Sequence, residues 1–254
     1  MLPDALKGWY VILLRPALTR EALRRAVLAS GAAPVLLPGL RLVAATDPDA
    51  ANRDLALALQ SPLVLATSPA AVHFARQLPA WRRAGNAHFA AVGSGTAKAL
   101  RRAGIGQVIA PDNRQDSDGL LDLPALNAKP LSAVGLITAP GGRGRLDEVL
   151  TARGVRIHRA NVYERLPARL DSRHQRALDA IQGPAALLHS SGEALSNVRA
   201  ALPAASWSRL LDALVIPSSE RLAAQARERG FRIGPMAESA SGPDLLAALR
   251  RAAG

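Results

Sequence analysis

The chain contains no cysteine and few aromatic residues. Among its 254 residues, Phe, Trp and Tyr together make up 3%. Without cysteine there can be no disulfide framework, no thiolate nucleophile and no cysteine–zinc site. The chain also lacks an uninterrupted apolar run of about 18 residues, which a membrane-spanning helix requires, so no membrane partner is expected.

Familiar catalytic signatures are missing too. The sequence contains no G-x-S-x-G elbow, no phosphate-binding P-loop and no H-x-x-E-H motif. Gly93-Ser94-Gly95 is half of a dinucleotide fingerprint, but the third glycine and the partner acid are absent. The five histidines show no metal-ligand spacing, and we interpret His189 as a packing residue. No metal site is therefore expected.

The formal net charge is +12, and it comes almost entirely from arginine. Such a charge fits an acidic partner, or simply arginines on solvated helix faces. Nucleic acid is not favoured, because no basic run is interleaved with aromatic residues that could stack on bases. The glycine-rich turn 141–145 could cradle an anion or be a flexible turn. A cytoplasmic location is expected, because cysteine is absent and the first ten residues do not resemble a secretory signal.

The chain repeats itself after about half its length. The segments 11–14, 65–68 and 92–96 are followed by similar segments shifted by 123 or 124 positions, at 134–137, 188–191 and 216–220. Two similar α/β units in one chain predict two lobes. Small molecules usually bind at such domain interfaces.

Short apolar segments alternate with segments of helical spacing. Strands are predicted at 10–14, 35–37, 63–66, 89–92, 108–109, 133–138, 156–159, 185–188, 213–216 and 232–233. Helices are predicted at 19–30, 69–77, 96–103, 119–126, 145–153, 194–201, 221–229 and 244–253. This alternation predicts an α/β fold of two similar lobes, each a parallel sheet flanked by helices.

Hydroxyl side chains follow the predicted strands, where parallel sheets bind ligands. The residues are Thr67, Ser68, Ser94, Thr96, Ser117, Ser190, Ser191, Ser218 and Ser219, with Gly95 in the turn between Ser94 and Thr96. Ser and Thr are common helix caps, so each can be purely structural. As a set, with backbone N–H groups and helix N-termini, they would suit carboxylates. Both interpretations stay open on these residues alone.

Several motifs together resemble one family. They are Leu14-Arg15-Pro16, 66–69, 91–97, 117–121, Gly144-Arg145-Leu146, Val162-Tyr163-Glu164-Arg165 and 218–222, and they are similar to uroporphyrinogen-III synthase. The similarity runs in order along nearly the whole chain. The segment 188–191 departs from the family, which more often has an apolar residue before Thr-Ser, and so does the glycine-rich turn 140–144.

The resemblance implies a domain organisation that the repeats alone do not give. Lobe one would comprise residues 1–38 and 167–254, and lobe two residues 39–166. A two-strand hinge would join them at 38–43 and 161–167, so the two repeats are not the two lobes. Pro38-Gly39 and Pro167 are plausible linker residues at these crossings.

The resemblance also implies an activity. The enzyme, a hydro-lyase, would close hydroxymethylbilane, a linear tetrapyrrole with eight carboxylates, to uroporphyrinogen III with loss of water and inversion of the last ring. It implies a monomer without metal or organic cofactor, with Tyr163 as the catalytic acid. The alternative role for Tyr163 is that of a buried hinge residue. Arg15 and Arg145 join the hydroxyl turns as expected substrate-binding residues.

Two other functions fit the chain less well. A non-enzymatic two-lobed cytosolic binding protein for an anionic metabolite would have the same architecture. A nucleic-acid-binding regulator is suggested only by the net charge of +12.

Overall fold

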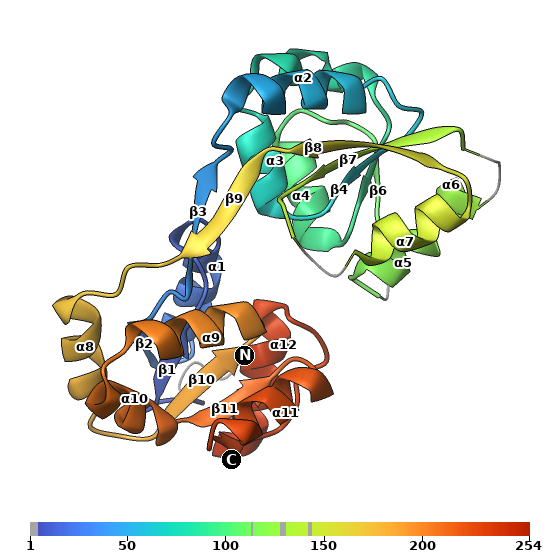
Figure 1. The fold of residues 1–254 in the computed structure, drawn as a ribbon. Coiled ribbons are helices and arrows are strands. Elements are labelled where there is room, and N and C mark those ends of the chain that lie inside the picture. Colours follow the sequence, from blue (N-terminus) through green and yellow to red (C-terminus); the bar gives the residue numbers. More distant parts are fainter. Residues whose placement is uncertain (1–4, 113, 128–130, 142–143) are drawn as a thin grey trace. The chain divides into compact units, whose positions relative to one another are not determined.

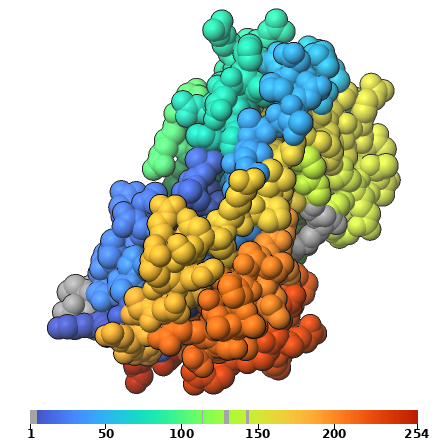
Figure 2. Space-filling view, turned by 60° about the vertical axis from the view of Figure 1, so that its left-hand side comes forward, coloured from blue at the N-terminus to red at the C-terminus, as the bar shows by residue number. Residues whose placement is uncertain are grey.

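The structure, a computed structural model, describes residues 5–112, 114–127, 131–141 and 144–254. The chain forms two compact units. Unit 1 combines the chain up to Arg41 with Leu166–Gly254, and unit 2 is Leu42–Arg165. The sequence places these boundaries at 38 and 167. In both views the blue N-terminal segment lies against the orange and red C-terminal segment, which together form unit 1 (Figure 1, Figure 2).

Unit 1 is built on a five-stranded parallel sheet. Its order is β12 (Arg232–Ile233), β11 (Leu214–Pro217), β10 (Ala185–His189), β1 (Tyr10–Leu13) and β2 (Ala33–Leu36). The central strands are apolar along their length, because helices cover both faces of the sheet. In the register, Ile12 of β1 lies between Leu187 and Val35.

Unit 2 contains a second five-stranded parallel sheet. Its order is β6 (Val108–Ile109), β5 (Phe89–Ala91), β4 (Val64–Ala66), β7 (Ala133–Thr138) and β8 (Arg156–Asn161). The two orders match when β4–β6 are aligned with β10–β12 and β7–β8 with β1–β2. This correspondence accounts for the internal repeat of the sequence. The predicted fold class, two parallel sheets flanked by helices, is confirmed.

Helices cover both faces of the unit 1 sheet (Figure 1). They are α1 (Ala17–Leu28), α8 (Ser172–Asp179), α9 (Gly192–Ala201), α10 (Ala204–Leu211), α11 (Glu220–Glu228) and α12 (Gly242–Ala253). Leu23 of α1 and Leu245 of α12 pack in the core on one face. Leu178 of α8, Val198 of α9 and Leu210 of α10 pack in the core on the other.

The unit 2 sheet is covered in the same way. Its helices are α2 (Pro48–Ala58), α3 (Pro69–Ala75), the 3₁₀ helix η1 (Pro79–Asn86), α4 (Ser94–Arg102), α5 (Ser117–Leu121), α6 (Pro124–Asn127) and α7 (Arg145–Ala152). Leu55 of α2, Phe74 of α3 and Leu100 of α4 pack in one core. Leu120 of α5 and Leu150 of α7 pack in the other.

A third, two-stranded sheet lies where the chain passes between the units. It pairs β3 (Leu40–Ala44) with β9 (Tyr163–Pro167). The Ala45 amide donates to the Val162 carbonyl at 3.4 Å, and the Ala168 amide donates to the Gly39 carbonyl at 3.3 Å. The residue that follows β3 thus bonds to the residue that precedes β9, and the residue that follows β9 bonds to the residue that precedes β3. The two strands therefore run antiparallel.

Some sequence predictions need correction or fall outside the described residues. The helix predicted at 119–126 is two short helices, α5 and α6, since the chain turns before Pro124 and a proline starts the second helix. Residues 142–143 of the glycine-rich turn, predicted either to cradle an anion or to be a flexible turn, lie outside the described residues. No helix of the described residues is long and apolar enough to cross a membrane.

Candidate active site

A polar cavity opens in unit 2 where the strand order reverses. From β4 the chain continues to β5 and β6 on one side, while β7 and β8 lie on the other. Ligands of such sheets bind at this switch point, beyond the carboxyl ends of the strands. The cavity measures about 420 Å³, and Thr67, Ser68, Thr138, Ala139 and Tyr163 are among the residues that line it.

Tyr163 is held firmly on one wall of this cavity. It is the first residue of β9, and only 6% of it is exposed. Its ring stacks on Phe74 of α3, with centroids 5.4 Å apart and planes 10° apart. The Tyr163 Oη lies 3.2 Å from Ser68 Oγ. Stacking fixes the ring and the hydrogen bond fixes the hydroxyl, so the phenol has a defined position in the cavity.

Ser68 has two partners within unit 2. It is the N-cap of α3, and its Oγ accepts from the Ala71 amide at 3.0 Å. Since that oxygen already accepts one hydrogen bond, its own proton is available to the Tyr163 oxygen. In that arrangement the phenol proton of Tyr163 is free to be donated to a bound molecule.

Thr67 ties together the ends of the two central strands. Its Oγ1 lies 3.0 Å from Thr138 Oγ1 and 3.3 Å from the Ile137 carbonyl oxygen. These contacts join β4 to β7 at the floor of the cavity. Thr67 therefore fixes the ends of β4 and β7 relative to each other, and the Thr67 side chain also lines the cavity.

Charged side chains surround the same cavity: Asp116, Arg145, Asp147, Arg159 and Arg165. Arg159 Nη2 donates to Asp147 Oδ1, and Arg165 Nη2 donates to the Pro140 carbonyl at 3.1 Å. The walls thus carry both signs of charge, with the cations held by neighbouring oxygens.

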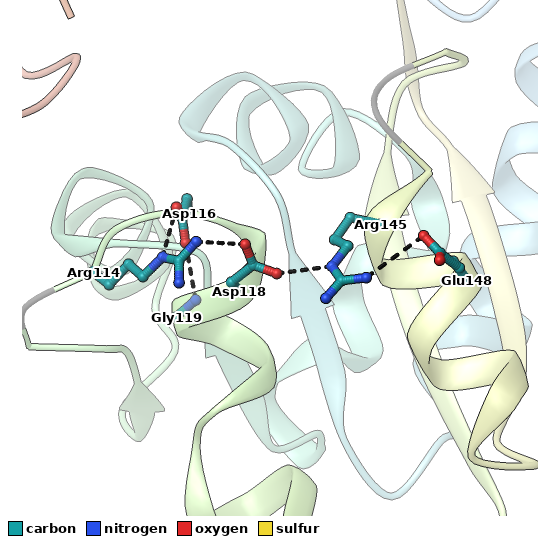
Figure 3. A network of polar contacts seen from close by, with 6 residues as sticks. All are labelled: Arg114, Asp116, Asp118, Gly119, Arg145 and Glu148. Atoms are coloured by element: carbon teal, nitrogen blue, oxygen red, sulfur yellow. Dashed lines mark hydrogen bonds and ion pairs between the residues drawn. The ribbon is translucent and has the colours of Figure 1, made fainter. Parts of the chain in front are cut away.

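Arg145 belongs to an ionic network that links α5 to α7. Its Nε donates to Asp118 Oδ1 at 2.9 Å, and its Nη1 lies 3.6 Å from Glu148 Oε2. Figure 3 shows the Asp118 carboxylate between Arg114 and Arg145. The hydrogen bond to Asp118 raises the pKa of the Arg145 guanidinium. Any carboxylate that binds Arg145 has to share it with these acids.

The neighbouring hydroxyls in unit 2 have different surroundings. Ser94 is held by Gln115, whose Oε1 accepts from its amide at 3.0 Å and its hydroxyl at 2.9 Å. Ser94 lines an adjoining cavity of about 680 Å³ rather than the cavity of Tyr163. Gly95 lies in the first turn of α4, as does Thr96, which is 2% exposed.

Ser117 lines the Tyr163 cavity but does not cap its helix. Asp116 is the N-cap of α5, and its Oδ1 accepts from the Gly119 amide at 2.9 Å. Asp116 and Gln115 were not among the predicted site residues. The spacing from Asp116 to Gly119 has the form of an N-cap and could have indicated the first of them.

The remaining predicted residues lie in unit 1, at the carboxyl ends of β1, β10 and β11. Ser191 caps α9 and accepts from Ala194 at 3.2 Å. Ser219 caps α11 and accepts from Leu222 at 3.4 Å. Ser190 and Ser218 directly precede these caps. Arg15 Nη2 donates to the Ala240 carbonyl, and burial lowers the pKa of Arg15.

The predicted set therefore divides between the units. Thr67, Ser68, Ser117, Arg145 and Tyr163 meet in one cavity of unit 2, whereas Arg15 and the four serines belong to unit 1. Their roles toward a substrate stay predictions. Among the described residues, no group of three or more histidine, aspartate or glutamate side chains could hold a metal ion.

The fold and the site together are those of a two-unit α/β protein with a ligand-binding crevice. Two doubly wound parallel sheets, joined by a short antiparallel pair, carry a polar crevice with a buried phenol at one switch point. A family model described as uroporphyrinogen-III synthase HemD matches residues 21–247. The chain belongs to the uroporphyrinogen-III synthase family, whose members are enzymes of tetrapyrrole biosynthesis.

Curated relatives support the family assignment over most of the chain. Uroporphyrinogen-III synthase of Salmonella typhimurium is 32% identical over 252 residues, which cover 94% of this chain and 99% of that protein. The Escherichia coli K12 enzyme is 30% identical over 199 residues, 75% of this chain and 79% of that protein. The resemblance predicted from the motifs is confirmed.

Solved structures show the same fold at lower identity. Uroporphyrinogen-III synthetase from Helicobacter pylori aligns with a TM-score of 0.60 and 17% identity, covering 97% of this chain and 99% of that one. A mutant of the Thermus thermophilus enzyme aligns with a TM-score of 0.57 and 21% identity, covering 96% and 98%.

Proposed function

We propose that the chain closes hydroxymethylbilane to uroporphyrinogen III, with loss of water and inversion of the last ring. The observation that carries this proposal is the placement of Tyr163 in the cavity at the β4–β7 switch point. The family assignment supplies the reaction. The Tyr163 phenol in the cavity is a group suited to the first step of that reaction.

Departure of the substrate hydroxyl is the step that needs an acid. The C–O bond breaks, the hydroxyl leaves with an added proton as water, and an azafulvene cation remains on the ring. A tyrosine phenol can donate that proton from a neutral state. We assign this donation to Tyr163, with Ser68 orienting the phenol through the 3.2 Å hydrogen bond.

Ring inversion is mainly a positioning problem. The azafulvene carbon has to be attacked by the substituted carbon of the last ring through a spiro intermediate, although simple head-to-tail closure competes. Holding two reacting groups in one geometry can lower a barrier by several kcal/mol. We assign this holding to the helix N-termini and the hydroxyls that cap them, together with Arg15 and Arg145, because both suit the substrate's carboxylates.

The reaction involves no net oxidation or reduction, since water is the only group lost. It therefore needs no redox cofactor, and we propose that it proceeds without any other organic cofactor or metal. We propose in addition that the enzyme is a monomer and acts in the cytoplasm. Light scattering behind a sizing column measures the first of these, and fractionation of the source cells measures the second.

One incubation separates the candidate functions. Freshly prepared hydroxymethylbilane is mixed with the protein, and the uroporphyrin isomers are separated after oxidation. The proposal predicts mainly the type III isomer. A binding protein or a nucleic-acid-binding regulator would leave spontaneous closure to the type I isomer unchanged, and that result would reject the proposed activity.

A further inference from the structure

Arg159 is a cation of the Tyr163 cavity that no sequence motif indicated. It lies on β8, where successive side chains point to opposite faces of the sheet. His158 faces α2, since its Nδ1 lies 3.1 Å from Ser61 Oγ just after that helix. Arg159 faces α7 and lines the cavity together with Tyr163. Its side chain is 33% exposed, so solvent and solutes can reach it.

Asp147 holds the Arg159 guanidinium from one side. Asp147 lies in the first turn of α7, where the helix dipole favours a carboxylate. Its Oδ1 accepts from Arg159 Nη2. Both side chains are partly exposed, and such pairs contribute little to folding stability. The pair uses one of the five N–H donors of a guanidinium, which leaves donors for a second carboxylate.

The size of the cavity determines how much of the substrate it can take. Its volume of about 420 Å³ lies in the lower part of the range of roughly 300–1,000 Å³ for sites that hold one small ligand. Hydroxymethylbilane has four rings and eight carboxylates, which is two on each ring. The cavity therefore accommodates only part of that molecule. Because Tyr163 lies there, that part is the ring that carries the departing hydroxyl.

Arg159 has fewer acidic partners than Arg145 among the described residues. Arg145 already faces both Asp118 and Glu148, whereas Arg159 is joined to Asp147. We propose that Arg159, oriented by Asp147, binds a carboxylate of the substrate ring whose hydroxyl leaves at Tyr163. This inference rests on the proposed function. In this scheme Arg159 is a substrate-binding residue and Asp147 is a positioning residue that acts through it.

The first experiment compares Arg159→Gln with Arg156→Gln. Arg156 lies on the same strand, is exposed and is absent from the cavity lining, so its replacement removes the same charge elsewhere. The bound carboxylate takes no part in the bond that breaks and keeps its charge throughout, so Arg159 binds it equally in the ground state and the transition state. Its loss therefore raises KM and leaves kcat nearly unchanged. We expect the KM for hydroxymethylbilane to rise roughly 10- to 100-fold in Arg159→Gln, and less than about two-fold in the control.

Two further variants test the positioning role of Asp147. Arg159→Lys keeps the charge without the planar fork, so its KM should lie between those of the wild type and Arg159→Gln. Asp147→Asn should raise KM by less than Arg159→Gln does. If Asp147 acts only through Arg159, the double variant will have the KM of Arg159→Gln alone. Additive effects in the double variant would contradict the positioning role.

The possible outcomes keep the inference separate from the proposed function. If the wild type makes no type III isomer, the proposed function fails. If the wild type is active and Arg159→Gln matches Arg156→Gln in KM, the function stands and the inference is overturned. Circular dichroism verifies that each variant is folded. Should Arg159→Gln not fold, Arg159→Lys and Asp147→Asn decide, and an unchanged KM in both rejects the inference.

Discussion

At the residue scale, the Ser68 hydroxyl serves both the fold and the site. It caps α3 through Ala71 and contacts the Tyr163 hydroxyl. Replacing Ser68 with Ala removes both hydrogen bonds, while the neighbouring backbone N–H groups remain. Loss of an N-cap costs about 0.5–2 kcal/mol of stability. We expect Ser68→Ala to lose that amount in urea unfolding, and to slow turnover less than removal of the Tyr163 hydroxyl does.

Ser191→Ala is the matched control for this prediction. Ser191 caps α9 of unit 1 in the same way, accepting from the Ala194 amide. Both variants should lose similar stability, but Ser68→Ala should be the slower enzyme. A Ser68→Ala rate equal to that of the wild type would mean that the contact between Ser68 and Tyr163 has no role in turnover.

His189 is a buried histidine without a hydrogen bond from either ring nitrogen to a described residue. The pKa of His189 is lowered to about 4, chiefly because burial penalises the charged imidazole; the nearby Gln225 side chain raises this pKa, while the positive charges of Arg229 and Arg221 lower it. Between pH 6.5 and about pH 4, the His189 imidazole is protonated in the unfolded chain but stays neutral in the folded chain. The stability that neutral His189 maintains is thus complete above pH 6.5 and is lost as the pH falls toward 4.

This acid sensitivity can be measured by removing the imidazole. We expect His189→Leu to reduce the loss in free energy of unfolding between pH 7.5 and pH 4.5 by roughly 2–3 kcal/mol. His73, an exposed residue of α3, provides the control. His73→Gln removes an exposed imidazole instead, and its free energy of unfolding is measured at the same two pH values. An identical pH slope in His189→Leu and the wild type would show that His189 does not cause the loss.

At the scale of the elements, Gly135 shows how closely α2 approaches the unit 2 sheet. A Cβ atom added to Gly135 of β7 would lie 2.2 Å from the Ala58 carbonyl oxygen at the end of α2. The backbone would have to move, because neither group can rotate away. Overpacking of this kind costs about 1–3 kcal/mol, occasionally more.

We therefore expect Gly135→Ala to lower the thermal midpoint clearly. Gly106→Ala is the control, because an added Cβ there meets nothing within 4 Å. The two midpoints are compared by circular dichroism under the same conditions. If Gly135→Ala and Gly106→Ala have the same thermal midpoint, α2 does not approach β7 as closely as the structure shows.

The elements also show what the sequence reveals and what it conceals. The strands predicted at 108–109, 133–138 and 232–233 have the bounds that the structure gives, because a glycine or proline lies within three residues of both ends of each segment and limits its length. Helices α2, α8 and α10 were not predicted. Asp47 and Asp171 cap the first two. Helix α8 has only Ala177 and Leu178 as apolar residues, whereas α2 carries Ala51, Leu55 and Ala58 at helical spacing, a signal that could have predicted it. Packing against the sheets stabilises these helices, and a local pattern does not report it.

In the candidate site, too, residues in local motifs could be predicted, and residues that depend on tertiary packing could not. Tyr163 was predicted through the family motif, and Ser68 through its position before a helix-starting proline. The pair of Arg159 and Asp147 was not predicted. It depends on which face of β8 an arginine occupies and on which helix covers that face. Such pairing is a property of the tertiary fold, so residues that lie 12 apart in sequence give no signal of it.

At the scale of the whole molecule, the net charge of +12 should act on capture of a substrate with eight carboxylates. Long-range attraction is screened by salt, and the Debye length shortens from over 10 Å to a few ångströms between about 0.05 and 0.5 M. We expect KM for hydroxymethylbilane to rise several-fold over that range while kcat changes little. A flat KM would mean that short-range hydrogen bonds alone recognise the substrate.

The central claim is that the Tyr163 hydroxyl assists water loss and so favours the type III product. Wild-type protein and Tyr163→Phe are incubated side by side with hydroxymethylbilane, and the isomers are quantified over time. The variant keeps the stacked ring and loses only the hydroxyl that contacts Ser68. We predict a rate roughly 10- to 100-fold lower, equal to about 1.4–2.7 kcal/mol of barrier. Type I isomer should accumulate while circular dichroism stays native. Wild-type rate and pure type III product from Tyr163→Phe would contradict this account and leave Tyr163 as a structural residue of β9.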